Sequence, residues 1–406
     1  MGDTLFLMTT PPQTSRVPVA IVGAGPAGLM LSHLLSRVGI ESVNIDIRSR
    51  KEIEETHRAG ILEQGSVDML LDGVSDRVLR DGHRHDGIEL GFGGQGHRID
   101  FQKLVGASAY LYPQTDVFID LADARERDGG DVRFSVTDVS VDDLLGSPVM
   151  RFTDEDGVAH EVRADYLVGA DGSRSVCRQA VPESERTQYF HEYPFAWFGI
   201  LAEAPPSSPE LIYSRSDDGF ALISQRTDTI QRMYFQCDPR ANVDDYSDDR
   251  IWEELSRRVE PNGFSLKTGP VIQKTVLPFR SFVQTPMRYG NMLLAGDAAH
   301  TVPPTGAKGL NLALADVKVL AQELESAIKG KDLAALDRYT ERALDRVWKA
   351  QHFSYWMTSM LHTHENATVF DNRRQIGELT MVTSSEHGQR YLAEAYTGWP
   401  ITAKDR

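Results

Sequence analysis

The segment from Val17 to Asp46 constrains the fold more than any other part of the sequence. An apolar run, Val17–Val22, leads into GAGPAG, a leucine-rich stretch with helical spacing follows, and a second apolar run ends in Asp46. Three glycines stand at the spacing G-x-G-x-x-G: Gly23, Gly25 and Gly28. Such glycines let a pyrophosphate approach a helix N-terminus, and an acid after the second strand can accept a ribose hydroxyl. The segment therefore predicts a β-α-β dinucleotide-binding unit.

Two later segments each end an apolar run with a Gly and an Asp. Tyr166–Gly172 reads YLVGADG, and we expect a helix to begin near Ser173 with Arg174 in its first turn. Leu293–Leu312 reads LLAGDAAHTVPPTGAKGLNL, and a helical apolar period begins at Leu310. A helix N-terminus offers free N–H groups and the positive end of a dipole to an anionic or polar ligand. Taken alone, the second segment could also be an ordinary strand–loop–helix junction.

Composition and charge exclude several classes of protein. The charge balance is 43 − 59 = −16 without a long basic run, which argues against a nucleic-acid partner. The two cysteines, Cys177 and Cys237, fit neither a zinc spacing nor a disulfide framework, so we expect no metal and a cytoplasmic protein. No apolar run approaches the length of a membrane span, so we expect no membrane partner. The Gly and Pro residues of the first apolar stretch favour a nucleotide turn over a signal peptide.

The chain divides into regions of different character. We predict an α/β fold with a flexible tail at 1–16, and a dinucleotide-binding domain at 17–188 that includes a β-hairpin at 86–110. Denser aromatics and short alternating runs predict an antiparallel sheet domain at 189–279. The chain then returns to the first domain at 280–310 and ends in a helical region at 311–406, where Asp332 is a good N-cap. The aromatic helix that ends near Leu361 could be core or a dimer face.

Six runs together carry a resemblance: GAGPAGL, RAGILEQG, ELIY, GFALISQR, GDAAHTVPPTGAKGLNLA and WMTSMLH. They resemble the class A flavoprotein aromatic monooxygenases, most closely those members that hydroxylate 4-hydroxybenzoate, from Val17 to Pro400. The resemblance implies an FAD-binding Rossmann-like (GR2-type) domain with an inserted antiparallel substrate domain and C-terminal helices. It also implies FAD, NADPH or NADH as reductant, O2 and a small aromatic acid as substrates, and a homodimer.

The resemblance assigns FAD contacts to residues spread over the chain: Gly23, Gly25, Gly28, Asp46, Arg58, Gln114, Asp171, Arg232, Asp297, Gly306, Leu310 and Asn311. The first three would hold the pyrophosphate, Asp46 the adenosine ribose and Asp297 the ribityl chain. The family usually has Glu where this chain has Asp46. Asp171 would also serve the nicotinamide coenzyme, and Arg232 would assist flavin movement. From the residues alone, Arg58 could equally pair with the glutamates that precede it.

A benzoate carboxylate is best bound by a planar, bidentate Arg. Arg226 matches the carboxylate-binding Arg of the family, and Ser224 shares its strand face because side chains alternate along a strand. Tyr234 follows on the next strand, and the resemblance places all three around the carboxylate. Arg226 could instead be a surface cation paired with Asp228.

At the opposite end of the ring, hydroxylation needs an electron-rich phenolate, yet a free phenol has a pKa of about 10 if tyrosine is the guide. The resemblance assigns a proton relay to Tyr213 and Tyr396, with His85 as its outer member. Histidine suits that position because it is the side chain that changes charge near neutral pH. The Pro304 carbonyl would contact the substrate hydroxyl.

The expected reaction is hydroxylation of 4-hydroxybenzoate to 3,4-dihydroxybenzoate. Alternatives are another para-substituted benzoate such as 4-aminobenzoate, a flavin dehydrogenase without oxygen insertion, and a non-enzymatic binder resembling GDP-dissociation inhibitors. The sequence does not decide between NADPH and NADH. Arg48, Arg50 and Lys51 favour binding of the 2′-phosphate of NADPH, whereas the nearby Glu52, Glu54 and Glu55 disfavour it.

Overall fold

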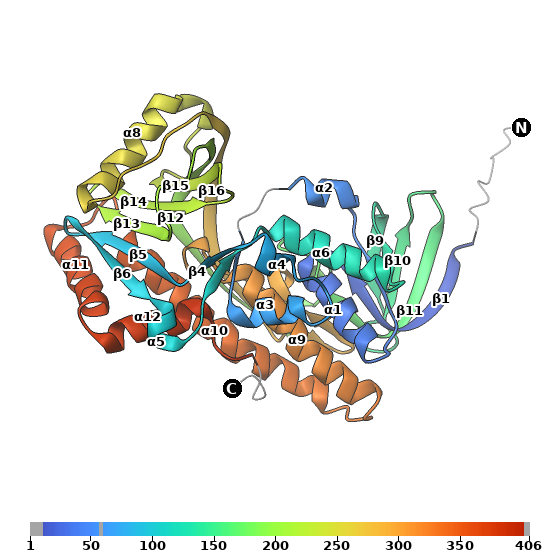
Figure 1. The fold of residues 1–406 in the computed structure, drawn as a ribbon. Coiled ribbons are helices and arrows are strands. Elements are labelled where there is room, and N and C mark those ends of the chain that lie inside the picture. Colours follow the sequence, from blue (N-terminus) through green and yellow to red (C-terminus); the bar gives the residue numbers. More distant parts are fainter. Residues whose placement is uncertain (1–10, 57–59, 402–406) are drawn as a thin grey trace, which may run out of the picture.

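The computed structural model describes residues 11–56 and 60–401, which form two lobes joined along long helices (Figure 1). The first lobe is built on an eight-stranded sheet whose central strands are parallel. Its path runs β17 (Arg288–Tyr289), β18 (Met292–Leu294), β11 (Ala159–Gly169), β1 (Gln13–Val22), β2 (Ser42–Ile45) and β8 (Asp131–Arg133). β10 (Val149–Thr153) pairs with β11, and β9 (Thr137–Asp142) pairs with β10.

Helices cover this sheet because its strands are apolar on both faces, as expected of parallel strands. The residues of β1 from Val19 to Val22 are buried, and α1 (Pro26–Arg37) packs against α6 (Gln114–Arg127) and α9 (Gly309–Ile328). Shorter helices complete the lobe: α2 (Arg50–Glu54), α3 (Gln64–Leu71), α4 (Arg77–Arg80) and α7 (Val176–Gln179). A three-stranded sheet, β3 (Ile61–Leu62), β7 (Ala109–Leu111) and β4 (His83–His85), links the lobes.

The second lobe is built on another eight-stranded sheet, which is mostly antiparallel. Its order is β19 (His300–Thr301), β16 (Val271–Thr285), β12 (Thr187–Glu203), β15 (Ile230–Cys237), β14 (Gly219–Gln225), β13 (Leu211–Ser216), β5 (Gly87–Phe92) and β6 (Gln95–Asp100). One face packs on α8 (Asp248–Val259) through residues such as Phe198 and Ile251. The other face packs on α10 (Ala335–Leu361) and α12 (Glu386–Thr397). Helices α5 (Phe101–Val105) and α11 (Val369–Thr383) close this side.

The α/β fold with an inserted antiparallel sheet is confirmed, but several predicted boundaries are wrong. β1 begins at Gln13, where it pairs with His160 of β11, so residues 13–16 belong to the sheet. The hairpin predicted at 86–110 as part of the first domain joins the second sheet, where β5 pairs with β13. The boundary at 279 falls inside β16, which continues to Thr285.

The helical predictions were accurate where the apolar period was long. α9 begins one residue before the predicted Leu310, and α10 ends at the predicted Leu361. However, α10 begins at Ala335 rather than directly after Asp332, Arg174 precedes α7, and α11 and α12 were not predicted as separate helices. The aromatic end of α10 is mainly core, since Phe353, Met357 and Met360 are buried.

Cys177 is buried and Cys237 is half-buried, and both are free thiols. Within residues 11–56 and 60–401, no helix is long and apolar enough to cross a membrane.

Candidate active site

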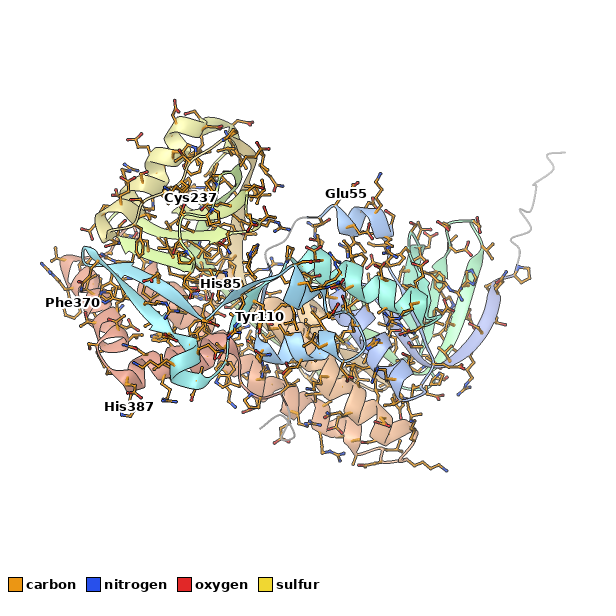
Figure 2. The ribbon with its side chains drawn as sticks, in the orientation of Figure 1. Glu55, His85, Tyr110, Cys237, Phe370 and His387 are labelled. Carbon is orange, nitrogen blue, oxygen red and sulfur yellow. The ribbon has the colours of Figure 1, made fainter. Side chains whose placement is uncertain are left out.

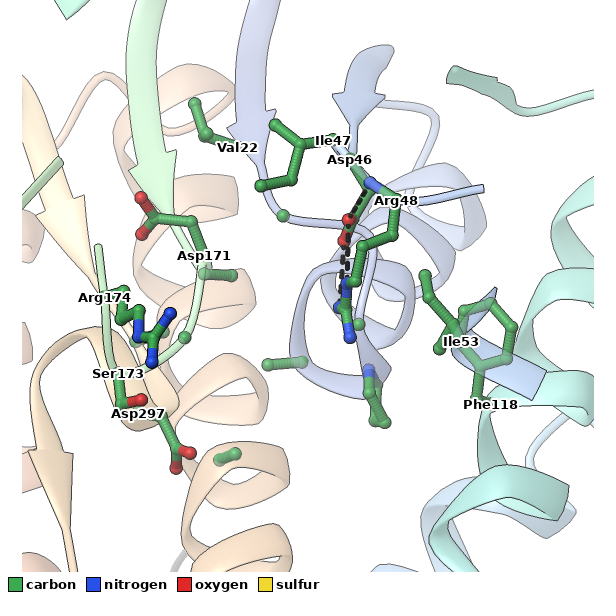
Figure 3. Close-up of a pocket in the computed structure, with 18 of the residues that line it drawn as sticks. Val22, Asp46, Ile47, Arg48, Ile53, Phe118, Asp171, Ser173, Arg174 and Asp297 are labelled. Atoms are coloured by element: carbon green, nitrogen blue, oxygen red, sulfur yellow. Dashed lines mark hydrogen bonds and ion pairs between the residues drawn. The ribbon is translucent and has the colours of Figure 1, made fainter. Parts of the chain in front are cut away.

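A cavity of about 680 Å³ opens at the carboxyl ends of the parallel strands (Figure 3). Seven predicted cofactor residues line it: Gly23, Gly25, Asp46, Gln114, Asp171, Asp297 and Leu310. They come from the ends of β1, β2, β11 and β18 and from the first turns of α1, α6 and α9. This is the edge where open α/β sheets bind their ligands.

The glycine turn after β1 is held by backbone packing. Gly23 has φ +105°, and a Cβ placed on it would lie 2.3 Å from the carbonyl oxygen of Ala170. A Cβ on Gly28 would lie 1.8 Å from the carbonyl oxygen of Gly23. By contrast, a Cβ on Gly25 meets no atom of the described residues within 4 Å beyond its chain neighbours, and Gly25 faces the cavity. Gly23 and Gly28 therefore serve packing, whereas Gly25 leaves room for a ligand.

Asp46 lies at the end of β2 in the cavity wall (Figure 3). Its Oδ2 accepts a hydrogen bond from the Ala24 N–H at 3.0 Å, and its Oδ1 accepts from the Arg48 N–H at 2.9 Å. The Arg48 guanidinium also pairs with it at 3.3 Å. A second guanidinium nitrogen of Arg48 lies 3.4 Å from Oδ2, so four donors fill the acceptor sites of this carboxylate, and a ribose hydroxyl would bind Asp46 by replacing the Arg48 guanidinium.

Asp171 lies on the opposite wall and caps α7. Its carboxylate accepts hydrogen bonds from the Ser175 hydroxyl at 2.5 Å and from the Val176 N–H at 2.7 Å. Burial raises the pKa of Asp171. Figure 3 shows Arg174 on the same side of the cavity as Asp171 and Asp297.

The turn that carries Asp297 is fixed by a buried ion pair. Gly296 has φ +60°, and its N–H donates to Asp316 Oδ2 of α9 at 2.9 Å. The same oxygen lies 2.6 Å from His300 Nε2. Burial disfavours the charged imidazole, but the charge and hydrogen bond of Asp316 outweigh it and raise the pKa of His300. The Gly296-Asp297 turn is therefore held in place by Asp316 of the following helix, α9. Sequence reasoning missed this contact.

The loop between Pro304 and Asn311 closes one end of the cavity. Asn311 donates to the carbonyl oxygens of Ile61 and Ala307 and accepts from the Glu63 N–H, so its side chain ties the loop to β3 and α3. A Cβ on Gly306 would lie 2.7 Å from the Ser354 hydroxyl. The side chain of Asn311 and the backbone of Gly306 thus shape the loop, while Leu310 reaches the cavity. Arg58 lies outside the described residues.

Sequence reasoning also missed Lys308 in this loop. Its Nζ is buried and donates to Glu63 Oε1 at 2.6 Å and to the Tyr396 carbonyl oxygen at 3.0 Å. Burial lowers the pKa of Lys308, and the pairing with Glu63 opposes that effect. Glu63 lies 245 residues away, so the sequence did not indicate this ion pair. The only sequence signal for a buried lysine was its position between Gly306 and Gly309.

The predicted substrate residues gather on the face of the second sheet that looks toward α10 and α12. Leu222 pairs with Tyr213 on one side and Tyr234 on the other, and Ser224 pairs with Arg232 in the next row. Ser224 donates to the Arg232 carbonyl oxygen at 2.7 Å, and Arg232 Nε donates to the Tyr234 hydroxyl at 2.5 Å. Arg232 therefore lies among the predicted substrate residues rather than on the wall of the large cavity.

This face is positively charged at one end and carries hydroxyl groups at the other. Burial and then the charge of Arg232 lower the pKa of Arg226, and Asp116 of α6 opposes them. The Tyr213 hydroxyl lies 2.8 Å from the Tyr396 hydroxyl of α12. Burial raises the pKa of Tyr213, so this hydroxyl is protonated at neutral pH. The Pro304 carbonyl oxygen accepts from the Ala307 N–H at 2.9 Å and retains a second lone pair.

Comparison with known proteins agrees with this geometry. The model of the FAD binding domain family matches residues 16–354. The p-hydroxybenzoate hydroxylase of Acinetobacter baylyi is 43% identical over 395 residues, which cover 97% of this chain and 98% of that protein. A probable NADH-specific resorcinol 4-hydroxylase of Rhodococcus jostii is 28% identical and aligns with 81% of this chain and 63% of its own.

Solved structures show the same fold. The p-nitrophenol 4-monooxygenase of Pseudomonas putida, at 18% identity, has a TM-score of 0.77 over 95% of this chain and 99% of that one. The cavity, with glycine turns and acids at both walls, fits a dinucleotide that has a pyrophosphate and two polyol segments. The fold and site are thus those of a flavin-binding oxidoreductase. The chain belongs to the FAD-binding family of flavin-dependent aromatic monooxygenases, and FAD is its cofactor.

The two kinds of glycine can be separated by substitution. Gly28→Ala places a methyl group against the Gly23 carbonyl, and overpacking of this kind costs about 1–3 kcal/mol. We expect the FAD-depleted variant to melt several degrees below wild type. Gly25→Ala, whose methyl group would project into open space, should melt like wild type when depleted but bind FAD at least tenfold more weakly. Thermal unfolding measures the melting temperature of each variant, and fluorescence titration with FAD measures its affinity. Equal melting temperatures of the two depleted variants would contradict the packing role of Gly28.

Proposed function

We propose that this monooxygenase hydroxylates 4-hydroxybenzoate at carbon 3, using NADH or NADPH and O2, and releases 3,4-dihydroxybenzoate. One observation carries the proposal: a single sheet face bears two half-buried arginines at one end and a buried pair of tyrosine hydroxyls at the other. A para-hydroxylated benzoate has the matching charges at its two ends. The 43% identity to a p-hydroxybenzoate hydroxylase supports the same substrate.

The carboxylate of the substrate would be bound at the arginine end. Arg226 is partly desolvated and is repelled by Arg232, so an anion there gains more than it would in water. Ser224 and Tyr234 add hydroxyl groups beside it. The ring of Tyr234 packs over Gly199 of β12, where a Cβ would come within 2.8 Å of the ring, so a glycine is needed to seat this tyrosine.

At the other end, Tyr213 would receive the hydrogen bond or proton of the substrate hydroxyl and exchange it with Tyr396. Both hydroxyls have raised pKa values because they are buried, so they relay a proton rather than act as bases. The Pro304 carbonyl would orient the substrate hydroxyl. When bound, FAD would activate O2 for transfer to the ring, and the chain supplies orientation, exclusion of water and proton management. Another para-substituted benzoate, such as 4-aminobenzoate, fits the same charges, and chromatography of the products distinguishes the two substrates.

We expect NADH to be the reductant. The three cations after Asp46 are each paired: Arg48 with Asp46, Arg50 with Glu54, Asp123 and Glu126, and Lys51 with Glu55. Six carboxylates thus stand against three cations at this rim, counting Asp46, Glu52, Glu54, Glu55, Asp123 and Glu126. A 2′-phosphate would be repelled there, because like charges at this range are destabilising.

We propose a cytoplasmic homodimer. Support for the dimer comes from an aromatic surface formed by Tyr189, His191, Trp348 and Tyr355. These rings touch across β12 and α10, with centroid distances of 5.3 Å for Tyr189–Trp348 and 5.7 Å for His191–Tyr355, while Trp348 and Tyr355 stay about half exposed. A group of exposed aromatic side chains of this kind is typical of a protein interface. The free thiols support the cytoplasmic location.

Removing the arginine should weaken substrate binding. Truncating one partner of a buried charge pair costs about 2–5 kcal/mol, so Arg226→Gln should raise the KM for 4-hydroxybenzoate by roughly 100-fold. Arg226→Lys keeps the charge but loses the bidentate geometry and should lie between Arg226→Gln and wild type. The exposed Arg240, changed to Gln, is the matched control and should leave KM unchanged. An unaltered KM in Arg226→Gln would remove this residue from the pocket.

The reductant and the substrate can be tested in one experiment. We expect anaerobic bleaching of the flavin to be fast with NADH, slow with NADPH, and accelerated by 4-hydroxybenzoate. The double variant Asp123→Asn/Glu126→Gln removes two of the three carboxylates that pair with Arg50, leaving Glu54, and should improve the use of NADPH by about two- to fivefold, the value of an exposed ion pair. Glu325→Gln, on α9, is the control. Faster bleaching with NADPH in the wild type would refute the electrostatic argument, and no acceleration by 4-hydroxybenzoate would refute the substrate.

The dimer is tested by sedimentation velocity. We expect a species of about twice the 45.3 kDa chain mass. Trp348→Glu should dissociate it, because a charge in an aromatic interface is costly to bury. Phe370→Glu, at an exposed apolar residue of α11, should not. Dissociation by Phe370→Glu but not by Trp348→Glu would place the interface elsewhere, and a monomeric wild type would exclude the dimer.

A further inference from the structure

His85 is a buried imidazole with one engaged and one unengaged nitrogen. It ends β4 where the two lobes meet (Figure 2), and its side chain is only 1% exposed. Nδ1 lies 3.0 Å from Glu210 Oε2. Nε2 has no hydrogen-bond partner among the described residues. Buried polar atoms are nearly always partnered, so an orphaned one points to a ligand or water in the working enzyme.

Glu210 connects this imidazole to the surface. It directly precedes β13, its side chain is 11% exposed, and its second oxygen accepts from Arg98 Nη2 at 2.9 Å. Arg98 is 40% exposed and also pairs with Asp100 at 2.6 Å. The path from His85 through Glu210 to Arg98 therefore ends in solvent at the β5–β6 hairpin.

Glu210 is also close to the tyrosine pair. Tyr213 follows it by three residues, as the third residue of β13. Phe101 stacks on Tyr396 with a centroid distance of 5.1 Å, and its N–H donates to the carbonyl oxygen of Asp86, which directly follows His85. Burial and the neighbouring Tyr213 raise the pKa of Tyr396, and the charge of Glu210 adds to that effect. His85 and the tyrosine hydroxyls thus lie around one small region.

We propose that Glu210 is a positioning residue that fixes the tautomer of His85 and, together with Arg98, forms the solvent end of the proton route from the substrate. The proposal rests on the function proposed above. An ionised carboxylate only accepts hydrogen bonds, so Nδ1 of His85 carries the proton and Nε2 presents its lone pair to the interior.

Proton transfer along this route is balanced. The phenol O–H bond breaks as its proton passes to the Tyr213 hydroxyl, and Tyr213 passes its own proton to Tyr396. Tyr396 passes a proton to His85 Nε2 through a bridging water, because no partner among the described residues lies within hydrogen-bonding distance of that nitrogen. The phenolate remains, and the imidazolium passes its Nδ1 proton to the Glu210 carboxylate, which releases it to solvent beside Arg98. The ring regains its Nδ1 proton when protons return along the same route to the product. The charged or titratable groups around His85 from the adjoining elements are Glu210, Arg98, Glu89, Asp100, Asp86, Arg84 and Tyr396.

The substitution Glu210→Gln tests the proposal. One amide oxygen cannot serve both Arg98 and His85; when it faces Arg98, the NH2 group faces Nδ1 and forces the opposite tautomer. Enzyme loaded with FAD and 4-hydroxybenzoate is jumped from pH 6 to pH 8.5, and phenolate absorption is followed by stopped flow. We expect ionisation at least tenfold slower than in wild type, with substrate affinity within twofold and the equilibrium pKa of the bound phenol not raised. Glu89→Gln, which removes a neighbouring carboxylate without touching His85, is the control.

Equal ionisation rates in Glu210→Gln and wild type would overturn the proposal. If wild-type enzyme forms no phenolate on the jump, the proposed substrate fails instead, so the two failures are distinguishable. Should Glu210→Gln not fold, the nitrogen-15 chemical shifts of His85 in the wild type identify the tautomer of its ring. A protonated Nδ1 with an unprotonated Nε2 is expected for the neutral ring, and the reverse tautomer would overturn the proposal.

Discussion

The close packing of two backbone turns at the ends of β1 and β11 is the constraint on which the rest of this structure depends. Gly23 lies directly against the carbonyl of Ala170, and Gly28 lies under Gly23, so no side chain larger than hydrogen fits at either position. This contact brings Asp46, Asp171 and Asp297 around one cavity, although they come from strands far apart in sequence.

The proposed substrate-binding face of the second sheet has half-buried positive charge at one end and buried, uncharged hydroxyl groups at the other. Arg226 and Arg232 lie near each other in a partly desolvated site, an arrangement that costs free energy unless an anion offsets it. The tyrosine pair at the other end is buried and uncharged, so it can pass a proton without holding a competing charge. The two ends of the face therefore match the proposed substrate, which has an anionic end and an ionisable hydroxyl end. Lys308, buried against Glu63 and the Tyr396 carbonyl, joins this region to the loop beside the FAD cavity.

Local patterns predicted those parts of the fold that form from neighbouring residues. The β-α-β unit, the strands of the second sheet and the long helix α9 were found because a period of two or 3.6 residues persists over each. The pairing of β5 with β13 was missed, since it joins residues more than a hundred positions apart. The roles of Asp316 and Glu210 were missed for the same reason: each acts through a partner that the sequence does not mark.

The sequence by itself determined the fold class and the cofactor and led to the residues of the proposed substrate-binding face, because glycine spacing, strand alternation and family motifs are local properties of the chain. Tertiary structure alone decided which of these residues share a wall, a face or a hydrogen bond. It placed Gly25 in the cavity but Gly28 beneath the turn, grouped Arg232 with the substrate residues, and gave His85 a carboxylate partner. The physical reason is that burial, pKa shifts and close backbone contact arise from the summed packing of distant segments.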